Sequence, residues 1–504
     1  MNLKVFNFWL LGVVASFLAY LPAVLAFFIK DDIALLNTAE FLPAVFQRSW
    51  PGGFYRPFAE LFFALEYSLF QIKSVPYHIV SYVAHVLTSY VVLKLAYLII
   101  NDIPVRRNMA ALIFLCHPVN TETVSWISGQ MSLMGTLCSV LVLLRLWSSN
   151  FQPSWRETAV VALLFVIGCG FYENFILIAG IVVIFQFLSN KDEIQLKNRL
   201  RNPALLMCIT ASSIYMLWRF HLLNLGTTYL QLVFSIETAT INLIYYMYLL
   251  LGGTAVGGRI IRYEPNTLFE GDNLFHVLPP FLLANTIILL AAIILSLLNR
   301  SNILCGSQSN GFTRAFLLSA IWIALSLAPV FLIPERPRRL TYMAVPGFAF
   351  FMTATIQYLA HRARLNAPFV NTLVGVYLII ALWTLYVRNS DWSYVGSLEK
   401  SISNSVSVER CSMVLFDVPT LIGDALFFNS ISTSYLLKKQ YGREVDVHLQ
   451  NLLFDETHPH IQNCTYRLVN GKIKLLDSDR EVAGPLFTRG HNWMISPQRN
   501  SSSR

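Results

Sequence analysis

Long apolar runs separated by short polar segments occupy the chain from Phe6 to about Val387. Each run has about 18 to 22 residues, enough for an α-helix to cross about 30 Å of hydrocarbon. Beyond these runs the chain is polar and mixed. We therefore predict an all-α polytopic membrane protein with candidate membrane helices at residues 6–28, 78–100, 109–126, 131–147, 158–188, 203–222, 232–252, 279–298, 315–333, 341–360 and 369–387.

The composition agrees with a membrane protein. Of the 504 residues, 55% are hydrophobic and 13% are charged, a balance outside the usual range of soluble proteins. From Arg388 onward there are 13 Lys and Arg against 12 Asp and Glu, so most of the formal net charge of +9 belongs to the membrane part. Such a surplus usually marks cytoplasmic loops that face anionic lipid. It indicates membrane lipid as a partner and argues against nucleic acid.

The first apolar run is followed directly by Lys30, Asp31 and Asp32. The run has about 23 residues, which is too long for a signal peptide, and the polar residues after it form a poor cleavage site. We expect a retained first helix. Lys4 before it places the N-terminus in the cytoplasm and the two acids outside.

Segment 158–188 leaves the orientation of the later helices open. If it crosses the membrane once, the chain has eleven spans and its C-terminus lies outside. If it forms a hairpin around Tyr172-Glu173-Asn174, every later orientation reverses. The hairpin places the basic stretch 191–201 in the cytoplasm, as the positive-inside rule prefers, but it also places the C-terminal tail there.

Two segments outside the predicted spans differ from ordinary loops. Residues 41–71 carry apolar positions at helical spacing with charges between them, which predicts helices in the outer interface that cover a cavity. Residues 252–273 are rich in glycine and charge, which is typical of a mobile loop.

The polar tail has its own pattern of short strands. Residues 411–419 and 444–449 are rich in β-formers, and residues 465–476 contain two alternating runs joined by Asn470-Gly471, a strong hairpin signal. We predict a membrane domain at residues 1–388. A small α+β soluble domain with a β-hairpin and a flexible end is expected at residues 389–504.

Asp31 and Asp32 are the first candidates for chemistry. Acids at a helix end are often only solvated flanking residues. Here an amphipathic segment follows them at once, so we expect them to face a cavity. A carboxylate in that place can take a proton from a hydroxyl or bind a divalent metal.

Several basic residues could bind an anion. Arg56, in Tyr55-Arg56-Pro57, either extends to lipid headgroups or binds phosphate through its paired guanidinium donors. The stretch from Glu335 to Tyr342 holds three arginines in four residues, among them Arg336 and Arg339. The positive-inside rule alone would place this stretch in the cytoplasm. If the protein binds an anionic lipid near Asp31 and Asp32, these arginines are instead expected on the outer side, together with the two acids.

Other polar residues are candidates for lining the outer cavity. His78 and His85 lie two turns apart on one face of the second span, as either a structural or a functional pair. His117 precedes Pro118, which ends the third span, so that Glu122 can supply another carboxylate. Glu173, at the break in segment 158–188, has a weaker case, since a polar residue at a kink explains it equally well.

Five segments in this order resemble the GT-C superfamily of membrane glycosyltransferases. The resemblance is to the dolichyl-phosphate-mannose-dependent O-mannosyltransferases that carry tetratricopeptide repeats and to their bacterial relatives. The matching segments are KDDIALLN, YRPFAELFFALEYSLF, PYHIVSYVAHVL, HPVNTETVSWISGQMSLMGTL and RRLTYMAVPGFAFF, which together cover about residues 25–150 and 335–352.

The resemblance implies a GT-C-like fold with about 11 to 13 transmembrane helices. The family's catalytic acid falls on Asp31 or Asp32, and its Arg-x-x-Tyr element falls on Arg339 and Tyr342. That element is expected on the outer side, which favours an outside tail. Two departures are Tyr172-Glu173 where relatives often have Lys-Glu, and Arg338-Arg339 where they often have Glu-Arg. No tetratricopeptide helices follow the membrane part.

The expected activity is sugar transfer from a polyisoprenyl-phosphate donor to an acceptor hydroxyl on a protein, glycan or lipid, by inverting displacement. Arg56, Arg336, Arg339 and Tyr342 would bind the donor phosphate, and Asp31, Asp32 or Glu122 would serve the acceptor. The compact tail favours a bacterial inner membrane with the site on the periplasmic side. The alternative is a secondary transporter or lipid-linked sugar flippase, although no internal repeat of the kind common in transporters is visible.

Overall fold

The computed structural model describes a set of residues with gaps between them: 3–32, 35, 45, 54–99, 104–189, 203–223, 235–253, 280–298, 309–332, 337–405, 413–417, 421–422, 425–426, 433, 437, 446–449, 463–469 and 472–476. The chain divides into two compact units. The first comprises Met1–Ala26, Thr38–Ser393 and Gly423–Ala425, and the second comprises Phe27–Asn37, Tyr394–Ile422 and Leu426–Arg504.

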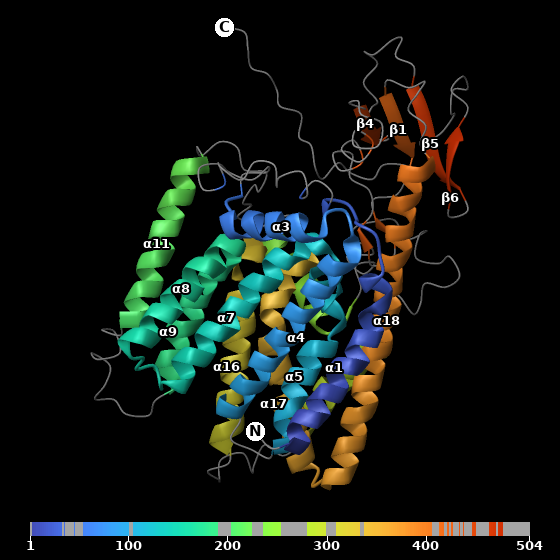
Figure 1. Ribbon diagram of the computed structural model, residues 1–504. Coiled ribbons are helices and arrows are strands. Elements are labelled where there is room, and N and C mark those ends of the chain that lie inside the picture. Colours follow the sequence, from blue (N-terminus) through green and yellow to red (C-terminus); the bar gives the residue numbers. More distant parts are fainter. Residues whose placement is uncertain are drawn as a thin grey trace. The chain divides into compact units, whose positions relative to one another are not determined.

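The first unit is a helical bundle (Figure 1). Its longer helices are α1 (Leu3–Val24), α3 (Pro57–Phe70), α4 (Ser74–Ile99), α5 (Pro104–Cys116), α7 (Gln130–Ser148), α8 (Trp155–Phe171), α9 (Ile178–Ser189), α11 (Pro203–Leu223), α12 (Ile236–Leu250), α15 (Pro280–Leu298), α16 (Ser309–Leu327), α17 (Val345–Arg362) and the first part of α18 (Ala367–Ser405). Short helical segments are η2 (Pro118–Asn120), α6 (Thr121–Ser125), η3 (Ile127–Gly129), η4 (Glu173–Leu177), η8 (Ala328–Leu332) and η9 (Arg338–Ala344).

Among the described residues, five helices are long and apolar enough to cross a membrane. They include Ser74–Ile99, of 26 residues, and Arg338–Arg362, of 25 residues. Four shorter apolar helices accompany them, such as Pro280–Ser296. The prediction of a polytopic integral membrane protein is confirmed.

Polar side chains join neighbouring helices inside the bundle. The indole nitrogen of Trp9 donates to the Ser89 hydroxyl at 3.1 Å, and the Ser16 and Tyr82 hydroxyls lie 2.7 Å apart. In hydrocarbon, such bonds between helices satisfy groups that have no water to bond. They fix α1 against α4.

Segment 158–188 is a hairpin. α8 begins beside the end of α7 and breaks after Phe171, where η4 follows. Near the end of α9, the ring of Phe185 lies 5.9 Å from that of Trp147, at the end of α7. α9 therefore returns to the side on which α8 began, and the two helices run in opposite directions.

Within the predicted span at residues 232–252, the structure describes a shorter helix, α12. α12 has 15 residues, about 22 Å, and is shorter than the hydrocarbon core. Its Asn242 side chain donates to the Val330 carbonyl, and its C-terminal Leu250 carbonyl accepts from His117. Val330 lies in η8 and His117 directly precedes η2, so α12 is bonded to both of these segments.

The last helix of the first unit runs in the same direction as the first. α18 and α1 both lead toward the end of the bundle at which α3 lies (Figure 1). The amide of Asn389, near the end of the apolar part of α18, donates to the Ala19 carbonyl near the end of α1. The chain thus leaves the first unit at the end where α1 also leaves it.

In the second unit, β1 (Met413–Asp417), β4 (Asp446–Leu449), β5 (Asn463–Val469) and β6 (Lys472–Leu476) form a sheet of order β4-β1-β5-β6. β1 is parallel to β4 and to β5, and β5 is antiparallel to β6. Val469 pairs with Lys472, so β5 and β6 form a hairpin, as expected from the sequence; residues 470–471 lie outside the described residues. The chain also contains the two-residue strands β2 (Leu421–Ile422) and β3 (Ala425–Leu426).

Candidate functional site

The entry to α3 holds a buried ion pair with η4. Arg56 directly precedes Pro57, which favours helix initiation at that position. The guanidinium meets Glu173 in a two-bond fork, with Nε 2.7 Å from Oε2 and Nη2 2.5 Å from Oε1. The break between α8 and α9 places Glu173 there, so the hairpin positions the carboxylate.

The environment of Arg56 keeps this pair charged. The guanidinium carbon lies 4.3 Å from the ring centre of Phe54 and 4.7 Å from that of Tyr172. Burial by itself lowers the pKa of Arg56, but the charge and hydrogen bonds of Glu173 raise this pKa more. The Nε and Nη2 edge of the guanidinium is occupied by Glu173, while Nη1 points to Met131 Sδ at 3.5 Å.

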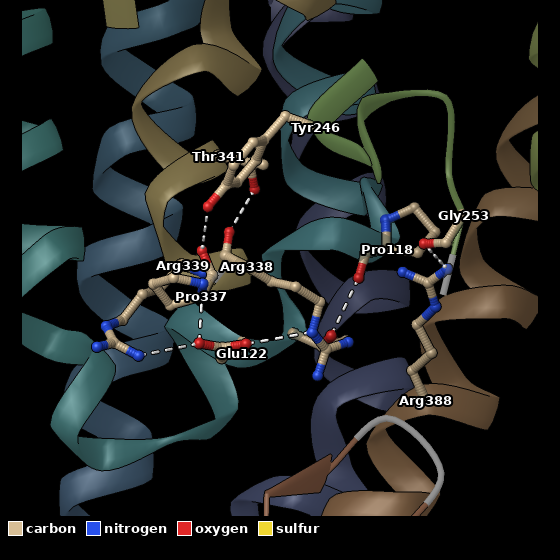
Figure 2. A network of polar contacts seen from close by, with 10 residues as sticks. Pro118, Glu122, Tyr246, Gly253, Pro337, Arg338, Arg339, Thr341 and Arg388 are labelled. Carbon is tan, nitrogen blue, oxygen red and sulfur yellow. Dashed lines mark hydrogen bonds and ion pairs between the residues drawn. The ribbon is translucent and has the colours of Figure 1, made fainter. Parts of the chain in front are cut away.

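A second carboxylate bridges two arginines of η9. Glu122, on α6, accepts from Arg338 Nε at 3.1 Å and from Arg339 Nη1 at 3.3 Å, as Figure 2 shows. The Arg339 backbone N–H also points to Glu122, at 3.4 Å. Arg338 and Glu122 have side chains only 3% exposed, whereas 27% of the Arg339 side chain is exposed. Arg339 is the accessible member of this group.

The short helix α6 is held in place by its flanking residues. The ring of His117 is bonded at both nitrogens: Nδ1 accepts from the Val119 N–H at 3.1 Å, and Nε2 donates to the Leu250 carbonyl at 2.8 Å. Because both ring nitrogens are engaged, we assign His117 a structural role. The chain then turns back at Gly129, beneath Thr123 and Glu122.

Gly129→Ala is expected to destabilise the first unit by about 1 to 3 kcal/mol. An added Cβ would lie 2.6 Å from the Thr123 carbonyl oxygen and 2.8 Å from that of Glu122, so the backbone under α6 must move. Thermal unfolding in detergent, followed by tryptophan fluorescence, measures the loss. Gly375→Ala is the matched control, because nothing lies within 4 Å of a Cβ there. Equal losses in both variants would contradict the close approach under α6.

Segment η9 is anchored by its backbone. The Arg339 carbonyl accepts from Ser132, and the Pro337 carbonyl accepts from Tyr246 at 3.3 Å. The Thr341 hydroxyl donates to the Arg338 carbonyl, a bond also visible in Figure 2. The two arginine side chains thus project from a segment whose backbone is fixed to α7 and α12.

Tyr342, near the end of η9, is fully buried inside the bundle. His85 Nε2 lies 3.1 Å from the Leu115 carbonyl, which can only accept, so Nε2 carries the ring proton. Nδ1 therefore accepts from the Tyr342 hydroxyl, 2.7 Å away. The described contacts of His85 and Tyr342 join α4, α5 and η9.

Tyr172 connects the two ion-pair groups. Its ring covers the Arg56 guanidinium, and its hydroxyl interacts electrostatically with Arg339. Burial is the main reason why the pKa of Tyr172 is raised, so the phenol stays protonated. On its other side, Arg339 lies over the ring of Trp126, 5.1 Å from its centre.

We call these residues the arginine cluster: Arg56, Glu122, Tyr172, Glu173, Arg338 and Arg339. Three guanidinium groups against two carboxylates leave one positive charge among them. The excess charge lies nearest water at Arg339, the most exposed of the three arginines.

Asp31 and Asp32 belong to the second unit. Asp32 is 1% exposed, and its Oδ2 accepts from the Ile29 N–H at 3.0 Å, which closes a turn around Lys30 at a φ of 52°. Asp31 is partly exposed. The turn therefore assigns Asp32 a structural bond and leaves Asp31 as the more accessible carboxylate.

The remaining predicted residues have separate places. His78 is buried in α4, and the Tyr55 carbonyl accepts from the Tyr215 hydroxyl at 3.0 Å. Arg336 lies outside the described residues. Within the part of the chain that the structure describes, no group of three His, Cys, Asp or Glu side chains could hold a metal ion.

Sequence patterns missed two members of the cluster. Tyr172 was noted as a departure from the family and Arg338 as one of several adjacent arginines, but neither was selected. A signal for Tyr172 was its place beside Glu173 at the helix break. The ring contacts that define its role join residues far apart in the chain.

No family model matches the chain. It is 25% identical over 195 residues to the human protein O-mannosyl-transferase TMTC3 and 26% identical over 196 residues to the mouse protein. Each match covers 35% of this chain and 21% of the relative. The Caenorhabditis elegans protein O-mannosyl-transferase F38B6.6 is 29% identical over 117 residues, which is 23% of this chain and 17% of that protein.

The chain resembles animal protein O-mannosyltransferases. The resemblance inferred from the five sequence segments is thereby confirmed. The chain spans about a fifth of the length of the TMTC3 relatives.

Two solved structures are similar at low identity. The crystal structure of ArnT from Cupriavidus metallidurans, bound to undecaprenyl phosphate, has a TM-score of 0.49 and 10% identity, over 92% of this chain and 93% of ArnT. The arabinofuranosyltransferase AftD from Mycobacteria has a TM-score of 0.41 and 14% identity, over 82% of this chain and 29% of AftD.

Proposed function

We propose that this protein is a membrane glycosyltransferase that moves a sugar from a polyisoprenyl-phosphate donor to an acceptor hydroxyl. The similarity to protein O-mannosyltransferases supports the reaction class. The outer face of a bacterial inner membrane is the proposed location, with the residues after Ser393 on that same face. A protein, a glycan or a lipid can supply the acceptor hydroxyl.

The arginine cluster is the observation that carries this proposal. A sugar joined to a lipid through one phosphate is a phosphodiester with a single negative charge, which matches the single excess positive charge of the cluster. Arg339 presents that charge to solvent, while Glu122 and Tyr172 fix its direction. Charge-assisted bonds from a guanidinium to phosphate oxygens are among the stronger hydrogen bonds in proteins.

Arg56 has a different part in this arrangement from the one its sequence suggests. The Nε and Nη2 donors of Arg56 are both bonded to Glu173. In this conformation Arg56 therefore holds Glu173 and Tyr172 in place and does not contact the phosphate. Arg339, and Arg336 in the segment just before it, remain the proposed phosphate ligands. Tyr342 would act on the donor only through the position of η9.

Arg339→Ala is expected to raise the KM for the lipid donor by about tenfold to a hundredfold. A hydrogen bond to a charged group contributes about 1.5 to 3 kcal/mol, which corresponds to that range. Initial rates at varied donor concentration measure the change. Arg156→Ala, an exposed arginine at the start of α8, is the matched control. A similar KM in both variants would remove Arg339 from the donor site.

Tyr172→Phe is expected to raise the donor KM by about threefold to tenfold with little change in thermal stability. The phenylalanine keeps the ring over Arg56 but loses the hydroxyl that faces Arg339. Because Tyr172 acts on the donor only through Arg339, the expected effect is smaller than the about 1.5 to 3 kcal/mol of a hydrogen bond to a charged group. Tyr377→Phe removes a buried hydroxyl that donates to Asn285, and serves as the control. An unchanged donor KM in Tyr172→Phe would show that Tyr172 does not contribute to donor binding.

The proposed reaction is a single displacement. The acceptor oxygen forms a bond to the anomeric carbon, while the bond from that carbon to the donor phosphate oxygen breaks and its electron pair stays on the phosphate. The hydroxyl proton passes to Asp31, and the anomeric configuration is inverted. Phosphate is already a good leaving group, so orientation and charge stabilisation provide most of the acceleration.

The test is transfer of radiolabelled sugar from a set of polyprenyl-phosphate sugars by the purified full chain in detergent. Release of polyprenyl phosphate together with labelled acceptor supports the proposal. Movement of an intact lipid-linked sugar across vesicle membranes, with no bond broken, would replace the transferase by a flippase or transporter.

A further inference from the structure

Two consecutive residues of α18, Arg388 and Asn389, bond to other parts of the first unit. Their side chains are 2% and 0% exposed, and they belong to an apolar helix that is long enough to cross a membrane. Charged and polar side chains are costly inside such helices and usually have specific partners. The partners of this pair connect α18 to the segments that carry Glu122 and hold η9.

Asn389 fixes the C-terminal end of α6. Its Oδ1 accepts from the Ser125 hydroxyl at 2.5 Å, and its Nδ2 donates to the Ala19 carbonyl of α1 at 3.0 Å. Ser125 is the last residue of α6 and follows Glu122 by three positions, about one helical turn. A helix of 5 residues is not stable by its backbone bonds alone, so contacts from other elements decide its direction. Asn389 therefore helps to set the position of the Glu122 carboxylate.

Arg388 fixes the C-terminal end of α12. Its Nη2 donates to the carbonyls of Gly252 and Gly253, both at 2.7 Å, and Figure 2 shows the bond to Gly253. The N–H groups of these glycines donate to the Leu249 and Tyr248 carbonyls, so both glycines are joined to the end of α12. The last carbonyls of a helix carry partial negative charge and lack partners within the helix, which makes a guanidinium a favourable partner.

The helix α12 in turn holds η9. The Tyr246 hydroxyl donates to the carbonyl of Pro337, the residue directly before Arg338 and Arg339. Arg339 bonds to Glu122 through its side chain and its backbone N–H. These bonds close a ring: α6 is joined to α18, α18 to α12, α12 to η9, and η9 back to α6. Figure 2 shows the links from α12 to η9 and from η9 to α6. We call this set of links the four-helix ring.

We propose that the four-helix ring positions Arg339 for the donor phosphate, with Arg388 and Asn389 as positioning residues. The inference rests on the proposed function, which assigns the phosphate to Arg339. Both positioning residues are buried, so they act through the ring and not by contact with the donor. Movement of α6 away from η9 would strain the bonds to α18 and α12 as well, so the guanidinium of Arg339 keeps one direction relative to Glu122.

The first test opens the ring at either of two links. Ser125→Ala and Tyr246→Phe each remove one hydroxyl and are expected to raise the donor KM by about twofold to fivefold, with an unchanged kcat. This is the lower part of the range for one neutral hydrogen bond, because the effect reaches the phosphate indirectly. Ser89→Ala is the control, since its buried hydroxyl accepts from Trp9 and donates to the Ala111 carbonyl, outside the four ring elements. It should lower thermal stability without changing the donor KM.

The second test combines the two ring variants. A ring that has been opened once is already loosened, so Ser125→Ala with Tyr246→Phe is expected to raise the donor KM by less than the product of the two single effects. Ser125→Ala with Ser89→Ala should have the donor KM of Ser125→Ala alone. A double ring variant whose effect equals the full product would overturn the closed ring, because the two links would then act independently.

Binding without transfer provides a separate readout. The dissociation constant of radiolabelled polyprenyl phosphate, measured with the full chain in detergent, should rise in Ser125→Ala and Tyr246→Phe and stay unchanged in Ser89→Ala. Unchanged constants in both ring variants would leave the ring a purely structural role and overturn the inference, even if sugar transfer is normal. A native protein that binds polyprenyl phosphate but transfers no sugar would instead contradict the proposed function.

Discussion

Asp31→Asn is expected to reduce the kcat of sugar transfer by more than about a hundredfold, the usual loss when a general base is removed. The amide has nearly the same shape as the carboxylate but cannot take the acceptor's proton. Asp31 is partly exposed, as a base that meets a substrate must be. The donor KM should stay within a few-fold, because the phosphate is bound elsewhere. Single-turnover transfer with the donor bound beforehand separates the two constants.

Asp32→Asn is the matched control for this experiment. Its amide oxygen can still accept the Ile29 N–H bond that Oδ2 accepts in the native turn, so the turn is kept. Transfer should remain within a few-fold of the native rate. Loss of activity in Asp32→Asn with normal turnover in Asp31→Asn would refute Asp31 as the base.

Glu122→Gln is expected to cost about 3 to 5 kcal/mol of stability, because it removes the charge that neutralises two arginines. Arg338 is the reason for the size of the effect: its side chain is 3% exposed, and Glu122 accepts from its Nε. A buried guanidinium that loses a carboxylate partner keeps its desolvation cost. Thermal unfolding in detergent measures the loss, and the donor KM should rise because η9 is displaced.

The control for Glu122→Gln is the same substitution at a carboxylate whose hydrogen bond glutamine can also make. Glu157, at the start of α8, accepts from the Ser154 N–H at 2.8 Å in a capping box, which glutamine also supports. Glu157→Gln should change stability by only a few tenths of a kcal/mol, since the site is exposed. An equally small loss in Glu122→Gln would mean that the Arg338 charge is compensated by other groups.

Helix positions followed from the sequence because they depend on local properties. A run of about 20 apolar residues must become a helix in hydrocarbon, where each backbone N–H and C=O needs a partner within the same segment. The observed α4, α7 and α17 agree with the predicted spans within a few residues at most ends. The pairing of β5 with β6 as a hairpin is equally local.

Residues 232–252 show what a local hydropathy pattern cannot predict. Apolar content predicted a crossing of about 20 residues, whereas the described helix α12 has 15 residues, and its Asn242, Tyr246 and Leu250 bond to Val330, Pro337 and His117. Hydropathy measures how well a segment tolerates hydrocarbon. It does not measure the polar partners that another part of the fold offers.

The sequence by itself determined that this protein is a helical membrane protein, and its motifs carried the resemblance to membrane glycosyltransferases. The partner of each charge was decided only by the tertiary structure. Arg56 meets Glu173 across 117 residues, and Arg338 meets Glu122 across 216. A buried charge is stable only beside its counter-charge, and packing brings the two together. For that reason the residue types could be chosen from the sequence, but the arginine cluster and the place of Tyr172 within it could not.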